Sequence, residues 1–301
     1  METAWLAERF EEHRPRLRAV AYRMLGSLTE AEDAVQDAWM RVSRAGTSEV
    51  ENVGGWLTTI LARVCLNALR SRRARHEEFV GLRLPDPIVS TDGELLPEEQ
   101  LLLADSIGLA LLVVLDTLAP PERLAFVLHD VFDIPFEEIS SIVGRTPAAA
   151  RQLASRARRR VKDASLPPPD ADRSRQREVV DAFFSAARRG DFDGLIAVLD
   201  PEVVLRSDFG ARRAPVPAVI RGAANVAGQA LLGAALPSAH LHPALVNGSA
   251  GVVVTVRGRP FSVMGFVVSG GRIVEIDAIA DPDRVRRIAA SVLAPEVGLK
   301  S

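Results

Sequence analysis

A run of basic side chains between Arg151 and Lys162 is the strongest candidate for chemistry in this sequence. It holds six arginines or lysines and no acid. Such a density of positive charge suits the phosphates of a nucleic acid. At 100° per residue, the apolar side chains fall on one side of a helix and most basic ones on the other. We therefore expect a helix that packs one face on a core and offers the other to DNA. Its candidate contact residues are Thr146, Arg151, Ser155, Arg156, Arg158, Arg159 and Lys162.

The residues just before this run predict how the helix is positioned. Ile139 and Ile142 mark the apolar face of a shorter helix, and Gly144 ends it. Thr146 can cap a second helix, with Pro147 at its first position. Two helices joined by a short turn that contains glycine make a helix-turn-helix candidate. The alternative is a surface helix whose basic face is simply solvated.

A second basic stretch covers residues 52–76. It contains five arginines and no acid, and Trp56 stands near its start. An aromatic ring beside a basic helix suits single-stranded DNA, because bases can stack on the ring while cations hold the phosphates. Trp56 could equally be a core residue and the arginines a soluble helix end. This segment alone leaves both readings open.

The helix expected over residues 30–42 has the opposite sign. Its buried stripe would include Ala34 and Ala38, and its outer face carries Asp33, Asp37 and Met40. An acidic face beside a basic one indicates two partners, a basic protein surface and a nucleic acid. The alternative is a mixed-charge helix that contacts only water.

The composition of the whole chain fits a multidomain protein of the reducing cytoplasm. The 301 residues favour two or three domains. The single cysteine, Cys65, lies in an apolar helical stretch, where we expect core packing. The N-terminus is charged throughout, unlike a signal peptide. The longest strongly apolar run, residues 107–115, is far shorter than the ~20 residues of a membrane helix. We expect no contact with a membrane.

Prolines and a change of periodicity predict the domain boundaries. Residues 1–80 and 98–165 have helical periodicity. Residues 81–97, with three prolines and two glycines, predict a linker, and residues 166–172 a proline-rich spacer. Residues 173–295 begin with a long amphipathic helix and continue with alternating β-branched segments, which predicts an α+β domain. The expected strands are 203–206, 251–257, 261–268 and 272–279.

Two stretches of the chain resemble a known family. YRMLGSLTEAEDAVQDAWMRV and GWLTTILARVCLNALRSRRAR resemble region 2 of sigma-70-type transcription factors. TLAPPERLAFVLHDVFDIPFEEISSIVGRTPAAARQLASRARRRV resembles region 4, and the short spacing between the two resembles the extracytoplasmic-function group. The resemblance implies two all-α domains, a helical bundle and a helix-turn-helix. It also implies a factor that directs core RNA polymerase to the −35 and −10 elements of promoters.

The same resemblance implies roles for matched residues. Thr146–Lys162 would read the −35 element, and the helices around Pro120–Phe132 would face the β flap of the polymerase. The residues implied to dock on the β′ clamp are Asp33, Gln36, Asp37 and Met40. Those implied to melt and read the −10 element are Trp56, Arg63, Asn67, Arg70, Arg72 and Arg73.

The third domain resembles a SnoaL-like, NTF2-type domain through REVVDAFFSAARRGDFDGLIAVLDPEVVLRSD. This implies helices on a curved sheet, forming a cone whose pocket could take a small-molecule ligand. A sigma-J-like subgroup of sigma factors carries such an extension, and we expect the domain to modulate the activity of this chain. Positions that correspond to its linker and C-terminal motifs are Leu84, Pro85, Asp86, Pro87, Asp208, Gly210, Asp281, Pro282 and Asp283.

Catalysis by this third domain is the remaining question. In the NTF2-type isomerases that this domain resembles, a carboxylate base acts together with a tyrosine. The one tyrosine of this chain, Tyr22, lies in the first domain. Asp208, His240, His242 and Asp277 remain as acid–base candidates, and the histidine pair lacks a clear third ligand for a metal. We expect a non-catalytic domain without metal or cofactor. The alternatives are a helix-turn-helix regulator with a ligand-binding domain, and a polyketide-cyclase-like enzyme with a DNA-binding arm.

Overall fold

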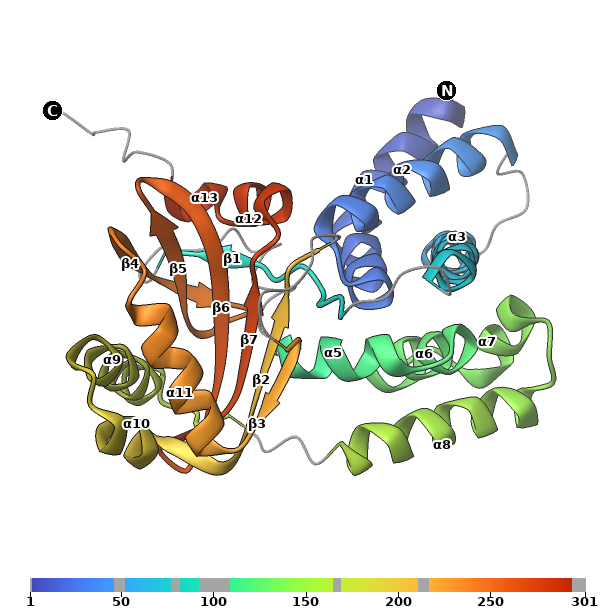
Figure 1. The fold of residues 1–301 in the computed structure, drawn as a ribbon. Helices are drawn as coiled ribbons and strands as arrows, with labels where there is room; N and C mark the ends of the chain where they lie inside the picture. Colours follow the sequence, from blue (N-terminus) through green and yellow to red (C-terminus); the bar gives the residue numbers. More distant parts are fainter. Residues whose placement is uncertain are drawn as a thin grey trace, which may run out of the picture. The chain divides into compact units, whose positions relative to one another are not determined.

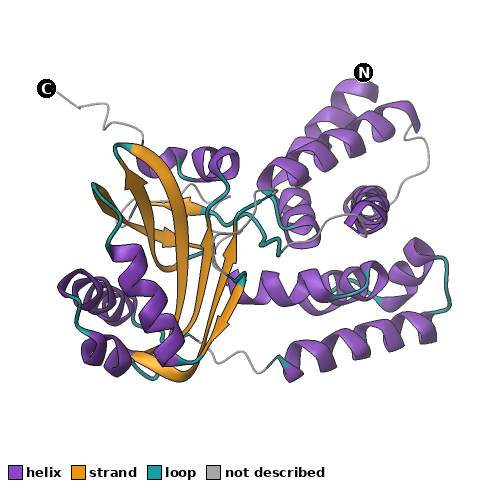
Figure 2. Cartoon of the chain, viewed as in Figure 1, coloured by secondary structure: helices purple, strands orange, loops and turns teal. Residues whose placement is uncertain are grey.

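The computed structural model describes residues 2–45, 52–76, 82–91, 109–164, 169–210 and 217–293. The chain divides into two compact units, Met1–Val80 with Leu111–Leu166, and Gly81–Ala110 with Pro167–Ser301. The first unit is helical, and the second contains the sheet (Figure 2). Residues 92–108, residues 166–168 of the predicted proline-rich spacer and the end of the chain after residue 293 lie outside the described residues.

Three helices at the start of the chain pack on one another in the first unit. In the second of them the predicted stripe is confirmed, since Ala34, Val35 and Ala38 are buried. Cys65 is fully buried in the third, and burial raises the pKa of its thiol to about 12, as expected of a core residue. These helices are α1 (Glu2–Leu25), α2 (Leu28–Ala45) and α3 (Val53–His76).

The predicted helix-turn-helix is confirmed in the same unit. Gly144 ends its first helix with a φ of +68°, a left-handed conformation that glycine adopts without strain. Thr146 caps the second helix, accepting a hydrogen bond from the amide of Ala149 at 3.2 Å, and Pro147 follows at the first position. The elements are α5 (Leu109–Thr117), α6 (Pro120–Phe126), the π-helix η1 (Val127–Val131), α7 (Phe136–Val143) and α8 (Pro147–Asp163).

The second unit is built on a seven-stranded sheet with the order β1-β4-β5-β6-β7-β2-β3. Strands β2 and β7 run parallel, and all other neighbours run antiparallel. Each of the four predicted strand segments lies on a strand, so the α+β prediction is confirmed. The strands are β1 (Val89–Ser90), β2 (Leu199–Asp208), β3 (Val219–Arg221), β4 (Ala239–Val246), β5 (Ser249–Val256), β6 (Arg259–Ser269) and β7 (Arg272–Ile279).

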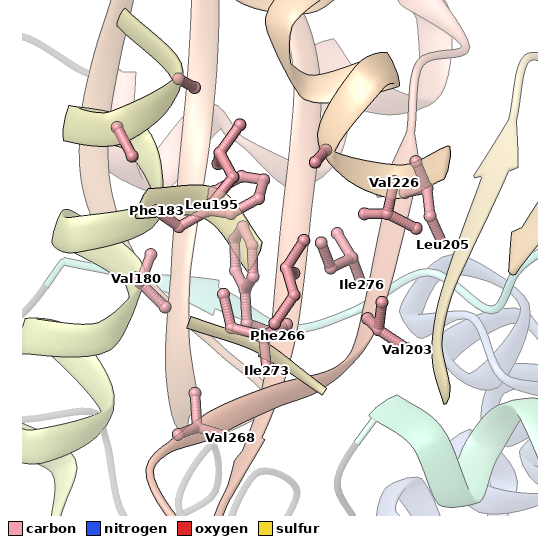
Figure 3. Packing of buried hydrophobic residues seen from close by; sticks show 14 of the residues in the cluster. Val180, Phe183, Leu195, Val203, Leu205, Val226, Phe266, Val268, Ile273 and Ile276 are labelled. Atoms are coloured by element: carbon pink, nitrogen blue, oxygen red, sulfur yellow. The ribbon is translucent and has the colours of Figure 1, made fainter. Parts of the chain in front are cut away.

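Helices cover one face of this sheet and bury its core. The layer consists of α9 (Arg173–Arg189), α10 (Phe192–Val198) and α11 (Ala223–Ala234), as Figure 1 shows. Phe183 of α9 meets Phe266 of β6 edge to face at 5.8 Å, with Ile276 beside them (Figure 3). Two short helices follow the last strand, α12 (Pro282–Ile288) and α13 (Ala290–Leu293).

Candidate nucleic-acid interface and linker site

The exposed face of α8 carries the predicted DNA contacts. Its cations keep their positive charge accessible, because Arg151 and Arg158 are paired only at the surface. Arg151 lies 3.1 Å from Glu137, and Arg158 lies 2.6 Å from Asp130. Surface pairs of this kind contribute little, so a phosphate can replace the carboxylate. All six of the contacts predicted within this helix are exposed: Arg151, Ser155, Arg156, Arg158, Arg159 and Lys162. Three of them (Arg156, Arg159 and Lys162) form no ion pair with the described residues.

Helix α3 presents a second basic face. Arg63, Asn67 and Arg70 are exposed and follow the four- and three-residue spacing that aligns side chains on a helix. Trp56 is half-buried in the first part of the helix, and Arg73 is exposed near its end. This arrangement keeps one aromatic ring and several cations on the same element.

Arg72 differs from the other predicted −10 residues. Its guanidinium donates to the carbonyl oxygen of Leu25 at 3.0 Å and forms an ion pair with Glu30. Its side chain is 19% exposed. Arg72 therefore joins α3 to the start of α2, a structural position that its place in a basic run did not predict.

The acidic face of α2 is exposed as predicted. Asp33, Gln36 and Asp37 all face solvent, and Asp37 forms a surface ion pair with Arg41 at 3.0 Å. Met40 is 44% exposed beside them. Acidic groups repel nucleic acid, so an exposed apolar side chain among them suits a protein partner with a basic surface.

A buried arginine joins α1–α3 to α5–α8 within the first unit. Arg123 of α6 is 2% exposed, and its Nε and Nη2 donate to the carbonyl oxygen of Arg23 at 3.2 and 3.1 Å. Its Nη1 donates to Asp116 at 2.7 Å. Arg63 of α3 also donates to the carbonyl oxygen of Ser141 of α7, at 3.4 Å. Both predicted DNA-binding helices thus belong to one packed unit.

In the second unit, Arg284 of α12 holds the predicted linker against the sheet. Its Nε donates to Asp86 at 2.7 Å, and its Nη2 donates to the carbonyl oxygen of Leu84 at 2.5 Å. Its Nη1 pairs with Asp208 at the end of β2. Asp208 in turn accepts from the amide of Leu84 at 2.8 Å. We call these four residues, Leu84, Asp86, Asp208 and Arg284, the clip.

The linker continues beyond the clip as part of the sheet. Ile88 and Asn247 exchange two hydrogen bonds of 2.7 and 2.8 Å. Val89 and Ser90 then pair with the end of β4 as strand β1. Ser291 of α13 donates to the carbonyl oxygen of Val89 at 2.7 Å. The described part of the segment predicted as a linker is therefore bonded to the C-terminal domain, and two of its residues, Val89 and Ser90, form a strand of the sheet.

The predicted C-terminal motif residues hold the residues of the clip in position. Asp281 caps α12 by accepting from the amides of Asp283 and Arg284 at 3.0 and 2.9 Å. Gly210 has a φ of +65°, and a side chain there would overlap the carboxylate of Asp281. Its amide donates to Asp208 at 2.8 Å. The structure thus brings these motif residues together around an arginine that the sequence analysis did not single out.

The opposite face of the sheet contains a cavity of about 600 Å³. Ser207 of β2 and Ala278 of β7 line it. Because neighbouring side chains of a strand point to opposite faces, Asp208 and Asp277 point away from this cavity. These two acid–base candidates therefore do not belong to the cavity. His240 does line the cavity.

Asp277 belongs to a buried cluster on that other face. Arg206 donates to it at 3.2 Å and to Glu275 at 2.5 Å. Burial, with a smaller contribution from the neighbouring charge of Glu275, raises the pKa of Asp277 to about 7.

The remaining histidine candidate, His242, lies 3.0 Å from the hydroxyl of Thr255. Within the described ranges, no three histidine, cysteine or acidic side chains gather as a metal site. None of the helices described here is long and apolar enough to span a bilayer.

The comparisons with known proteins decide the family. The model of Sigma-70 region 2 matches residues 9–75, and that of Sigma-70, region 4 matches residues 108–161. The chain is 35% identical to the ECF RNA polymerase sigma factor SigJ of Mycobacterium tuberculosis (strain ATCC 25618 / H37Rv), over 91% of either protein. The chain belongs to the extracytoplasmic-function group of the sigma-70 family.

Further similarity supports this sigma factor's whole architecture. It is 32% identical to the probable ECF RNA polymerase sigma factor SigI of Mycobacterium tuberculosis (strain CDC 1551 / Oshkosh), over 97% of both chains. The crystal structure of SigJ from Mycobacterium tuberculosis superposes with a TM-score of 0.74 at 33% identity, covering 92% of this chain and 97% of that one. The predicted sigma domains and the sigma-factor function are confirmed. The C-terminal domain has the predicted α+β fold. A simple helix-turn-helix regulator would leave the region 2 match unexplained.

Proposed function

We propose that this sigma factor docks on core RNA polymerase, reads a promoter with α3 and α8, and is regulated by the clip between its linker and its C-terminal domain. The buried hydrogen bonds of Arg284 to Asp86 and Leu84 carry the regulatory part of the proposal. They connect the segment between regions 2 and 4 to a domain that neither region contains. We expect the factor to act in the cytosol, where polymerase and chromosome meet.

Each surface has a partner of matching chemistry. The acidic face of α2 (Asp33, Gln36, Asp37 and Met40) suits the β′ clamp, and the helices around Pro120–Phe132 would face the β flap. Region 2 would read the −10 element through Trp56, Arg63, Asn67, Arg70 and Arg73. Region 4 would read the −35 element from the major groove, with the N-terminal half of α8 on base edges and its flanks on phosphates.

Promoter binding requires regions 2 and 4 to separate. The names of the two elements place them about 25 base pairs apart, which is ~85 Å at ~3.4 Å per base pair. In the first unit, however, Arg123 and Arg63 connect the two regions directly. These contacts must break before α3 and α8 can reach both elements. The packed unit is therefore the form of the free factor, and the form bound to polymerase is open.

Short tethers allow the C-terminal domain to control this opening. Helix α3 ends at His76 and the clip begins eight residues later at Leu84, a segment that spans at most about 29 Å. Helix α8 ends at Asp163, and seven residues later Asp170 is anchored, so that this tether spans at most about 25 Å. Asp170 accepts from the amides of Gly270 and Gly271 at 2.9 Å, and these bonds lower its pKa. Releasing the clip would lengthen the first tether.

We infer a regulatory role for the C-terminal domain and no catalytic one. Asp208 belongs to the clip, and Asp277 is paired with Arg206 on the same face of the sheet. Neither carboxylate can meet a substrate in the cavity. The family extension would thus modulate the sigma core.

The test is transcription in a purified system of core polymerase, promoter DNA and the full-length factor. Arg284→Met should change promoter output or affinity for core polymerase severalfold, because it releases Asp86 and Leu84. Arg286→Ala is the matched control, since its side chain is exposed and pairs only with Asp283 three residues away. Output and affinity equal to wild type in Arg284→Met, with the linker shown to be released, would refute the regulatory role.

A further inference from the structure

The cavity of the C-terminal domain has the size and walls of a small-molecule site. Its volume of about 600 Å³ lies within the ~300–1,000 Å³ typical of such sites. It opens between α9, α11 and the sheet, and its walls include Phe183, Phe184, Val226, Met264 and Ile276. These apolar side chains suit a ligand with a hydrophobic body.

Two hydroxyls in the walls reach the cavity without a protein partner. Ser207 of β2 and Ser262 of β6 line the cavity and are 7% and 5% exposed. Their side-chain hydroxyls form no hydrogen bond with any described residue. A hydroxyl that reaches an apolar cavity without a protein partner can bond to a ligand. These groups therefore point to a ligand that carries oxygen or nitrogen atoms on its hydrophobic body.

The charges around the cavity favour an anion. Among the described residues that line it, Arg188 is the one with a full charge, and none is an aspartate or a glutamate. Arg188 forms no ion pair with the described residues, whereas its neighbour Arg189 pairs with Asp191 at 3.4 Å. An unneutralised guanidinium at the edge of an apolar cavity attracts a carboxylate or a similar anionic group.

The mouth of the cavity is apolar and open to solvent. Leu232, Leu236 and Phe261 line the cavity while remaining 69%, 36% and 41% exposed. Exposed apolar side chains that cluster around an opening are typical of a binding site. A hydrophobic ligand would cover them on entry.

We propose that this cavity binds an apolar organic acid, with its hydrophobic body between α9, α11 and the sheet and its anionic group at Arg188. Polar atoms on the body would bond to Ser207 and Ser262. Binding itself is independent of the proposed sigma activity, and only its regulatory effect rests on that proposed function. A ligand in the cavity could affect the clip over a short distance. Ser207 and Phe209, which line the cavity, alternate along the chain with Asp208 of the clip and with Gly210, which bonds to it.

A pair of fluorescent probes tests the proposal on the full-length protein. The anion 8-anilinonaphthalene-1-sulfonate and its uncharged analogue N-phenyl-1-naphthylamine share the same rings. We expect each to bind one site, the anion more tightly. Arg188→Ala should weaken the affinity for the anion about three- to tenfold, since only the anion binds the guanidinium. The affinity for the uncharged probe should stay within about twofold of wild type.

Cavity-filling variants separate this site from general surface adsorption. Ala278→Phe should weaken the affinity for both probes at least about tenfold while the circular dichroism spectrum is retained. If that variant misfolds, Ala230→Phe replaces it, with the same expected result. Phe192→Ala is the control, because Phe192 is 42% exposed but does not line the cavity. Unchanged probe affinity in a folded cavity-filling variant would overturn the site. Equal affinities for the two probes, unaffected by Arg188→Ala, would overturn the preference for an acid.

Discussion

Arg284 and Asp86 lie 198 residues apart in the sequence and meet with Nε and Oδ1 at 2.7 Å. The same guanidinium holds Asp208, so one buried cation joins the linker, β2 and α12. A buried charge with two carboxylate partners and a backbone carbonyl is well compensated. Removing one partner should therefore loosen this junction without unfolding the domain.

Asp86→Asn should release the linker locally. The amides of Leu84 and Ile88 are bonded to Asp208 and Asn247, and they become accessible only when the linker lifts. Loss of a charge-assisted hydrogen bond of about 1.5–3 kcal/mol should speed their hydrogen exchange about 10- to 100-fold. Exchange mass spectrometry of the peptide over 84–90 measures this. Asp283→Asn, at an exposed site, should leave the exchange unchanged, and equal protection in both variants would show that Asp86 does not hold the linker.

Gly210→Ala should disrupt the support of the clip. Gly210 and Gly258 both have positive φ, so alanine strains the backbone at either position by about 1–2 kcal/mol. Only at Gly210 does the new side chain also meet the carboxylate of Asp281, the cap of α12; at Gly258 it enters open space. Thermal unfolding should show a clearly larger loss of stability for Gly210→Ala than for Gly258→Ala. Equal losses would mean that the overlap relaxes freely.

Arg151→Ala should weaken binding to the −35 element. Arg151 lies over the ring of Phe136 at 5.6 Å and pairs with the exposed Glu137, so it is held near the first half of α8. If it reads a base, the loss should be about 1–3 kcal/mol and should depend on the promoter sequence. Equilibrium binding to a panel of −35 variants measures it. A loss that is uniform across the panel would show that Arg151 contacts a phosphate. Glu137→Gln removes the carboxylate that pairs with Arg151 and should strengthen binding slightly.

Asp277 should make the stability of the C-terminal domain depend on pH. Its pKa of about 7 in the folded protein lies above the ordinary 3.8, so between about pH 4 and 7 the folded state holds a proton that the unfolded chain has lost. The free energy of unfolding therefore falls as pH rises through this window, by ~1.4 kcal/mol per pH unit at most. Calorimetry from pH 5 to 8 should show a shallower fall for Asp277→Asn. Parallel curves for the two proteins would contradict the shifted pKa.

Local signals made much of the fold predictable. Gly144, Thr146 and Pro147 end one helix and begin the next through their own backbone preferences, so the helix-turn-helix could be predicted from a few residues. The four predicted strands have β-branched residues in alternation. Strand β4 was missed because Pro243 interrupts its pattern. That proline is tolerated because β1 pairs only with Val246 and Leu245, which leaves the rest of β4 as an edge.

The two buried arginines that hold each unit together, Arg284 and Arg123, could not be predicted from local sequence signals. Arg284 has its partners 76 and 198 residues away, and Arg123 bonds to a carbonyl group 100 residues earlier. Nothing near either arginine distinguishes it from a solvated one. The strand β1 likewise forms in a proline-rich segment because Asn247 and the end of β4 lie beside it. Such positions depend on contacts between distant segments of the chain.

As a sigma factor, this protein is expected to direct core RNA polymerase to promoters. The most direct measurement is transcription from genomic fragments of its source by core polymerase, with and without the purified full-length protein, with the 5′ ends of the transcripts mapped. We expect discrete start sites that appear only with the protein. These start sites should be lost when Arg151→Ala and Arg156→Ala together remove the −35 face. Binding of the protein to DNA without any new start site from core polymerase would contradict it.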